Sequence, residues 1–182
     1  MPDYIWNGEE LPIPVDKIVD SMFGLRVRKV QDMSQAPGAP AVSPEKISGL
    51  LLTGLGEIWV NAAEDEEWPT RGRFTIGHEL GHWVLHRTGQ QKLFCRTAVV
   101  GPETAGDSLG GDVSPDSTVT SRPAIPVTEE EANAFSAALL MPAHLLSEQH
   151  QGCQGDMNRL KQTFDCSHKA MSRRIGAVIY SR

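Results

Sequence analysis

The chain has 182 residues, of which 40% are hydrophobic, and a formal net charge of −6. Such a length supports one ordinary core and leaves no room for two large domains, so we expect a single domain over residues 1–182. The negative charge argues against nucleic-acid binding by the whole surface, because such binding uses Lys and Arg to neutralise phosphates. No apolar run approaches the roughly 18 residues of a membrane-spanning helix, so we expect a cytoplasmic protein.

The first half of the chain predicts a helix followed by a hairpin. Residues 14–22 have the pattern of an amphipathic helix. Residues 35–44 (QAPGAPAVSP) are rich in Pro and Ala, which predicts a surface loop. Two β-prone runs, residues 47–53 and 57–62, are joined by two glycines around Leu55, and this pattern predicts a β-hairpin.

Residues 78–82 read HELGH, which has the form HExxH. In a helix, residues four apart point the same way, so His78 and His82 can offer imidazole nitrogens to one metal ion. Glu79 lies about 100° further round the helix, beside the position that the metal leaves open. With zinc as the Lewis acid, Glu79 is a candidate general base for the hydrolysis of an amide bond.

The surroundings of this motif argue against a chance match. Ile76, Leu80 and Val84 form an apolar row at helical spacing, which predicts a buried helix. Gly77 and Gly81 each weaken such a helix by up to about 1 kcal/mol relative to alanine. Their position beside the candidate ligands indicates that another element packs very close there.

The motif alone does not supply a third ligand. A metzincin would have Gly at position 85 and His at position 88, but this chain has Leu85 and Thr88. His86 follows His82 by four residues, yet three histidines spread over eight residues do not easily converge on one ion. We therefore favour His86 as a packing histidine or a partner of a ligand, with ligation as the alternative.

Residues 128–141 (TEEEANAFSAALLM) predict a second helix that carries acids. Of its three consecutive glutamates, only Glu131 is followed at helical spacing by apolar residues alone, which predicts that it points inward. A buried carboxylate needs a partner, and a metal ion supplies one, so Glu131 is our candidate third ligand. The alternative is a capping box, in which Glu131 bonds back to the backbone of Thr128.

Basic residues outnumber acidic ones from residue 157 onward. The segment 156–182 reads as a helix, a turn, Ser167 as an N-cap and a second helix, which is the outline of a helix-turn-helix. The alternative, which we favour, is a helical pair packed on the rest of the chain through an apolar inner face, formed by Leu160, Phe164, Met171 and Ile175. We therefore expect no direct nucleic-acid binding. The three cysteines, Cys95, Cys153 and Cys166, are odd in number and not spaced as CxxC, so we expect reduced thiols.

Together these segments resemble the ImmA/IrrE family of zinc-dependent metallopeptidases. Typical members read RRFTxAHELGHxLLH and EANxFAAxLLMP, and residues 71–86 and 131–142 of this chain match these patterns. The resemblance implies one zinc ion with His78, His82 and Glu131 as ligands and Glu79 as the base. Mn²⁺ or Fe²⁺ also suits two imidazoles and a carboxylate.

The resemblance also implies an α+β, zincin-like metallopeptidase domain. It would have a small twisted sheet, the HExxH helix, the Glu131 helix and a C-terminal helical pair. In zincin-like peptidases an edge strand beside the metal helix receives the substrate as an added strand, and the hairpin is a candidate for that role. Residues 100–127 have no counterpart in the family and are rich in Gly, Ser, Thr and Pro, so we expect a mobile insertion, either a lid or a tolerated surface loop.

For function, the resemblance implies a metalloendopeptidase that cleaves a helix-turn-helix transcriptional repressor at a specific site. The alternative is a toxin-like or regulatory module of a toxin–antitoxin pair, whose effect comes from contact with its partner. The complete HExxH motif favours the enzyme, because a module that only holds a metal has no need of Glu79.

Overall fold

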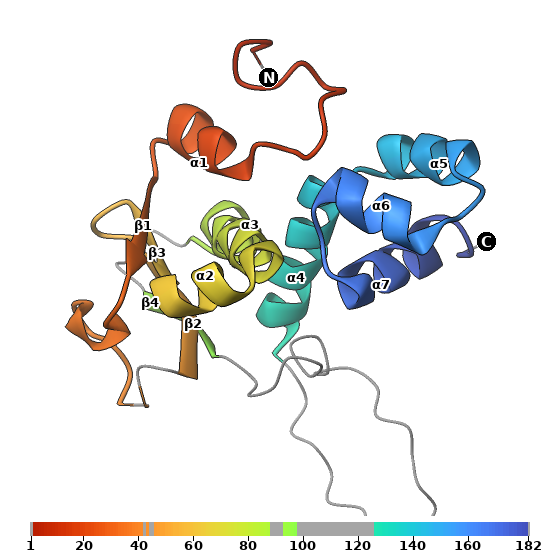
Figure 1. Ribbon diagram of the computed structural model, residues 1–182. Coiled ribbons are helices and arrows are strands. Elements are labelled where there is room, and N and C mark those ends of the chain that lie inside the picture. Colours follow the sequence, from red (N-terminus) through yellow and green to blue (C-terminus); the bar gives the residue numbers. More distant parts are fainter. Residues whose placement is uncertain (1, 42, 44–45, 88–92, 98–125, 182) are drawn as a thin grey trace, which may run out of the picture.

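The computed structural model describes residues 2–41, 43, 46–87, 93–97 and 126–181. The chain is a mixed α+β protein (Figure 1). Its helices are α1 (Val15–Phe23), α2 (Ala62–Glu67), α3 (Pro69–Leu85), α4 (Val127–Leu140), α5 (Ala143–Gly152), α6 (Met157–Phe164) and α7 (His168–Val178), with a short 3₁₀ helix η1 (Met33–Gln35). Its strands are β1 (Arg26–Val30), β2 (Ile47–Leu52), β3 (Glu57–Asn61) and β4 (Leu93–Thr97). The insertion predicted at 100–127 falls almost entirely outside the described residues.

The four strands form one sheet in the order β1-β3-β2-β4. β1 runs parallel to β3, whereas β2 is antiparallel to both β3 and β4. The predicted hairpin is therefore confirmed as β2 and β3. The expectation that this hairpin offers an edge to a substrate is wrong, because both of its strands are hydrogen-bonded on both sides. Among the described strands, the edges of the sheet are β1 and β4.

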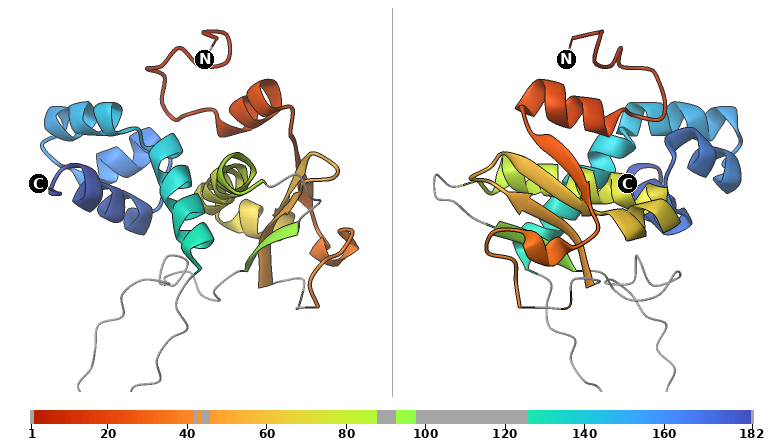
Figure 2. Two further views of the ribbon diagram at one scale, coloured as in Figure 1. Left: turned by 180° about the vertical axis from the view of Figure 1, so that it is seen from behind. Right: turned by 60° about the vertical axis from the view of Figure 1, so that its left-hand side comes forward.

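The sheet has two differently covered faces, since successive side chains of a strand point to opposite sides. On one face, Leu51 and Ile58 belong to the same core as Leu80 of α3. On the other face, Leu50 and Trp59 pack with the segment around η1. Figure 2 shows α3 between the sheet and α4, with α5, α6 and α7 beyond α4. Helix α3, which carries the HExxH motif, thus lies at the centre of the molecule.

The C-terminal helices close the side away from the sheet. The inner face predicted for α6 and α7 is buried in the main core, which confirms the packed helical pair. Ser167 caps α7 by accepting a hydrogen bond from the Ala170 backbone N–H, as predicted. Two arginines anchor this part: Arg174 donates to the Met141 carbonyl, and Arg73 of α3 pairs with Asp165 between α6 and α7. Helix α5 was not predicted.

Two further predictions concern membrane-spanning helices and the cysteine thiols. None of the helices within the described ranges is both long and apolar enough to cross a membrane. Cys153 and Cys166 are free thiols, as expected. Burial, together with the charge of Asp165, raises the pKa of the Cys166 thiol to about 12, so this thiol stays protonated at neutral pH.

Candidate metal centre

The HExxH residues lie in the most enclosed part of α3. The helix spans 17 residues, and every residue from Thr75 to His82 is buried. The sheet covers one side of it and α4 covers another. The apolar row predicted for this helix ends at Leu80, because Val84 is exposed. The two histidines are therefore held by helix turns on both sides and by packing on several sides.

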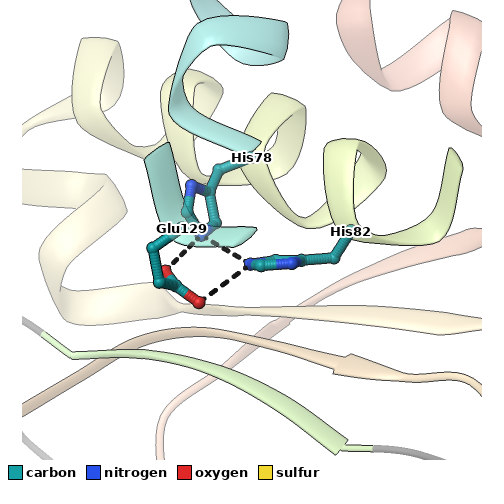
Figure 3. Close-up of side chains that lie close together, drawn as sticks. All are labelled: His78, His82 and Glu129. Carbon is teal, nitrogen blue, oxygen red and sulfur yellow. Dashed lines mark hydrogen bonds and ion pairs between the residues drawn. The ribbon is translucent and has the colours of Figure 1, made fainter. Parts of the chain in front are cut away.

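Three side chains converge beside α3, as Figure 3 shows. The Nε2 atoms of His78 and His82 lie 3.0 Å apart. The Glu129 carboxylate of α4 spans the two rings, with Oε2 3.2 Å from His78 Nε2 and Oε1 3.2 Å from His82 Nε2. The ligand atoms of this His-His-Glu group all lie within 4.8 Å of one another.

The donor set of this group fits a divalent cation. Zinc binds imidazole nitrogen and carboxylate oxygen, and three protein ligands with one open position are typical of catalytic zinc sites. Burial by itself raises the pKa of the Glu129 carboxyl, but the hydrogen bonds and charges of His78 and His82 outweigh it and hold the pKa well below the usual range. Glu129 is therefore an anion at neutral pH, the form in which a carboxylate binds a metal.

The structure corrects the third member of the predicted ligand set. Glu129, and not Glu131, lies beside the two histidines. The side chain of Glu131 is 54% exposed, and its Oε2 lies 3.6 Å from Nε2 of His86. The capping box with Thr128 is not formed either, because α4 begins at Val127 with Pro126 as its N-cap and no side-chain cap.

The error has a physical reason in the face that α4 turns inward. Its buried residues are Ala132, Ser136 and Leu140, which are spaced by four. Glu129 precedes Ala132 by three positions and Ser136 by seven, so it shares that face, whereas Glu131 is turned away from it. The prediction looked for neighbours that are all apolar, but one of the three residues on the buried face is the polar Ser136.

Small residues are needed because α3 and α4 cross at very short range. A Cβ placed on Gly77 would lie 2.6 Å from Ser136 Oγ, and one placed on Gly81 would lie 3.1 Å from the Ala132 Cα. Ser136 Oγ also donates a hydrogen bond to the Phe74 carbonyl at 2.9 Å. The prediction that another element packs very close to the two glycines is confirmed, and that element is the helix that carries Glu129.

Asn133 is a site residue that the sequence reasoning missed. Its Oδ1 lies 3.0 Å from His78 Nδ1. An amide oxygen accepts, so His78 Nδ1 carries a proton, and Nε2 is the ring nitrogen that faces Glu129 and the candidate metal position. The signal was present in the sequence, because Asn133 follows Glu129 by four residues and therefore lies on the same side of α4.

Glu79 lies on a different side of α3 from the His-His-Glu group. Its side chain is fully buried between α3 and the sheet. A Cβ on Gly49 of β2 would lie 3.0 Å from Glu79 Oε1, so the carboxylate packs directly against the strand backbone. The neighbouring Ser48 donates to Glu64, which in turn forms an ion pair with Arg71 of α3 at 2.6 Å. These contacts tie β2 to α3 next to the proposed base.

His86 lies at the end of α3, next to the site and outside the group of three. Its ring centroid is 5.3 Å from that of His82. Its Nε2 lies 3.1 Å from the Thr128 carbonyl oxygen in the first turn of α4. This position agrees with the interpretation of His86 as a partner of a ligand rather than as a ligand.

A comparison with known families found a match over part of the chain. The sequence model of a peptidase family, described as the IrrE N-terminal-like domain, matches residues 115–176. The ImmA/IrrE resemblance is confirmed over this segment. The matched part of the family domain contains Glu129, Asn133 and most of the C-terminal helical region, whereas the histidines of α3 lie upstream of it. No curated protein sequence matches the chain.

Proposed function

We propose that this chain is a zinc-dependent metalloendopeptidase of the gluzincin type, with His78, His82 and Glu129 as ligands and Glu79 as general base. The observation that carries the proposal is the convergence of two buried imidazole nitrogens and an ionised carboxylate from two helices. The match to a peptidase family supports hydrolysis of a peptide bond as the reaction.

The chemistry divides between the metal and the side chains. Zinc at such a site supplies Lewis acidity, which polarises a peptide carbonyl and lowers the pKa of water. The Glu79 carboxylate accepts a proton from the attacking water and returns it to the nitrogen of the leaving amine. Asn133 keeps the His78 ring in the tautomer and orientation that ligation requires.

The sheet offers a place for the substrate backbone. β4 pairs with β2 on one side only among the described strands, so its other side presents backbone N–H and C=O groups. An extended peptide satisfies such groups when it adds as a further strand. We therefore assign to β4 the role that the sequence suggested for the hairpin.

The ImmA/IrrE resemblance supports a helix-turn-helix repressor as the substrate. A toxin-like module that acts through partner contact is the competing function. The two differ in what they require of Glu79, because binding of a partner does not use a general base.

The test compares wild type with Glu79→Gln, a variant that keeps the shape of the side chain and all three ligands. Both proteins are measured for zinc content and for cleavage of candidate helix-turn-helix repressors from the same genome, with cleavage sites read by mass spectrometry. We expect one zinc per chain in both proteins and cleavage by wild type alone. Equal cleavage by Glu79→Gln, or a wild type that binds no zinc, would refute the proposal.

A further inference from the structure

The proposed third ligand lies near the end of a helix, where the backbone has fewer hydrogen bonds than in the interior. Glu129 is in the first turn of α4, and the N-cap residue Pro126 makes no side-chain cap hydrogen bond. The first N–H groups of a helix lack a regular i→i−4 partner, and helix ends fray for this reason. The Glu129 N–H makes a shorter-range hydrogen bond, to the Pro126 carbonyl at 2.9 Å. A carboxylate carried by such a turn needs a contact from outside the helix to keep its place.

His86 supplies such a contact from the end of α3. The Thr128 carbonyl oxygen accepts a hydrogen bond from His86 Nε2 at 3.1 Å, one residue before Glu129. The Glu131 carboxylate, 3.6 Å from the same nitrogen, favours the tautomer that has its proton on Nε2. The side chain of His86 is only 11% exposed, whereas its hydrogen bond to Thr128 lies at the exposed start of α4.

The His86 backbone is held in place by α3, the helix that carries the other two proposed ligands. The His86 backbone N–H donates to the His82 carbonyl at 2.9 Å, which anchors His86 to the last turn of α3. The link therefore runs from the turn that holds His82 to the turn that holds Glu129. Further along α4, Asn133 lies within hydrogen-bond distance of His78, and Ser136 donates to the Phe74 carbonyl of α3.

We propose that His86 is a positioning residue that holds the first turn of α4 so that Glu129 reaches the metal. This inference rests on the proposed zinc site. It assigns His86 no ligand role, because its Nε2 is engaged with the Thr128 carbonyl and lies outside the group formed by His78, His82 and Glu129. His86 acts on the metal through the backbone that carries the third ligand.

The experiment measures zinc affinity by competition with a chromogenic chelator, which needs no substrate. His86→Ala should weaken zinc binding by about 10-fold to 100-fold, the effect typical of residues that orient metal ligands. His86→Gln, which keeps an N–H donor at a similar reach, should recover much of that loss. His144→Ala, a change at an exposed histidine of α5, serves as the matched control and should leave the affinity unchanged.

A double-mutant cycle separates positioning from ligation and from general damage to the fold. In a Glu129→Gln background, His86→Ala should cause little further loss, because the ligand that His86 positions is already impaired. A full additional loss in that background would show that His86 acts on the metal independently of Glu129, and would overturn the inference. Equal losses in His86→Ala and His86→Gln would overturn it as well.

The outcomes also separate this inference from the proposed function. If wild type binds zinc and cleaves its substrate but His86→Ala binds zinc equally well, only the positioning role fails. If wild type binds no zinc, the proposed metal centre fails and the role of His86 fails with it.

Discussion

The two helices that meet at the candidate metal centre hold their ligands in different ways. His78 and His82 lie within a 17-residue helix, and both side chains are 1% exposed. Glu129 lies in the first turn of α4, and its side chain is 30% exposed. Turns on both sides fix the histidines, whereas the glutamate depends on contacts between the helices. For the proposed zinc site, α3 supplies the rigid donors and the α3–α4 contact determines how well the third donor fits.

Removal of a donor from the rigid side should have the largest effect. In His82→Ala, we expect zinc affinity to fall by well over the roughly 100-fold that loss of an orienting residue causes, and cleavage to disappear. Because zinc bound to the folded state stabilises it, added zinc should raise the Tm of wild type but not of this variant. Calorimetry with and without zinc measures the affinity and the Tm shift. An equal zinc-induced Tm shift in the two proteins would contradict the ligand role of His82.

The second prediction distinguishes the two glutamates of α4. Glu129→Gln removes the anionic donor and should lower zinc affinity by more than about 10-fold, whereas the matched change Glu131→Gln should lower it less. Zinc titration of both variants decides between them. A larger loss in Glu131→Gln would restore the assignment made from the sequence and would show that the first turn of α4 is oriented differently in the zinc-bound protein.

The different outcomes for these ligands explain what the sequence was able to predict. The convergence of His78 and His82 follows from spacing within one helix, which helical geometry alone determines. Glu129 depends on how a second helix is rotated against the first. That rotation follows from small residues that meet glycines, one of which is the polar Ser136, and an argument from apolar neighbours alone does not predict it.

The glycines did contain the missing information. Gly77 and Gly81 are spaced by four, and so are Ala132 and Ser136 on the facing helix. Matching these two pairs would have placed Glu129 on the inner face, because it precedes Ala132 by three residues. A close helix crossing is therefore predicted better from small residues, which let two helix backbones approach, than from apolar residues in general.

The sheet likewise contains strands that the sequence predicted and strands that it did not. The hairpin of β2 and β3 was predicted because its strands are adjacent in the sequence and joined by a glycine-containing turn. The outer strands were not predicted. β1 reads RVRKV and pairs in parallel with β3 across a long connection, so neither its composition nor its surroundings in the sequence mark it. β4, the edge strand that we propose for the substrate, was not predicted either.

The third prediction tests the close crossing itself. Gly81→Ala places a Cβ 3.1 Å from the Ala132 backbone, where a neighbouring helix must give way. Such overpacking costs about 1–3 kcal/mol, which exceeds the gain of up to about 1 kcal/mol from the better helix former. We expect lower stability in chemical denaturation and weaker zinc binding, because α4 is pushed away with Glu129.

A matched control lies in α7. Gly176 is an exposed glycine in a helix and has no atom within 4 Å of an added Cβ. Gly176→Ala should therefore stabilise the protein by up to about 1 kcal/mol and leave zinc affinity unchanged. If Gly81→Ala behaved in the same way, the close contact between α3 and α4 would not be what sets the position of the third ligand.

The smallest effect is expected from Asn133, which acts on a ligand that α3 already holds firmly. Asn133→Ala removes the acceptor for His78 Nδ1 but leaves the imidazole enclosed in its helix, so we expect a loss of zinc affinity of about 10-fold, near the lower end of the range for such partners. Asn133→Asp keeps an acceptor oxygen in place and should retain most of the affinity. A loss after Asn133→Ala larger than that after Glu129→Gln would reverse the comparison between the helices, because it would mean that the orientation of His78, and not the fit of the third donor, limits metal binding.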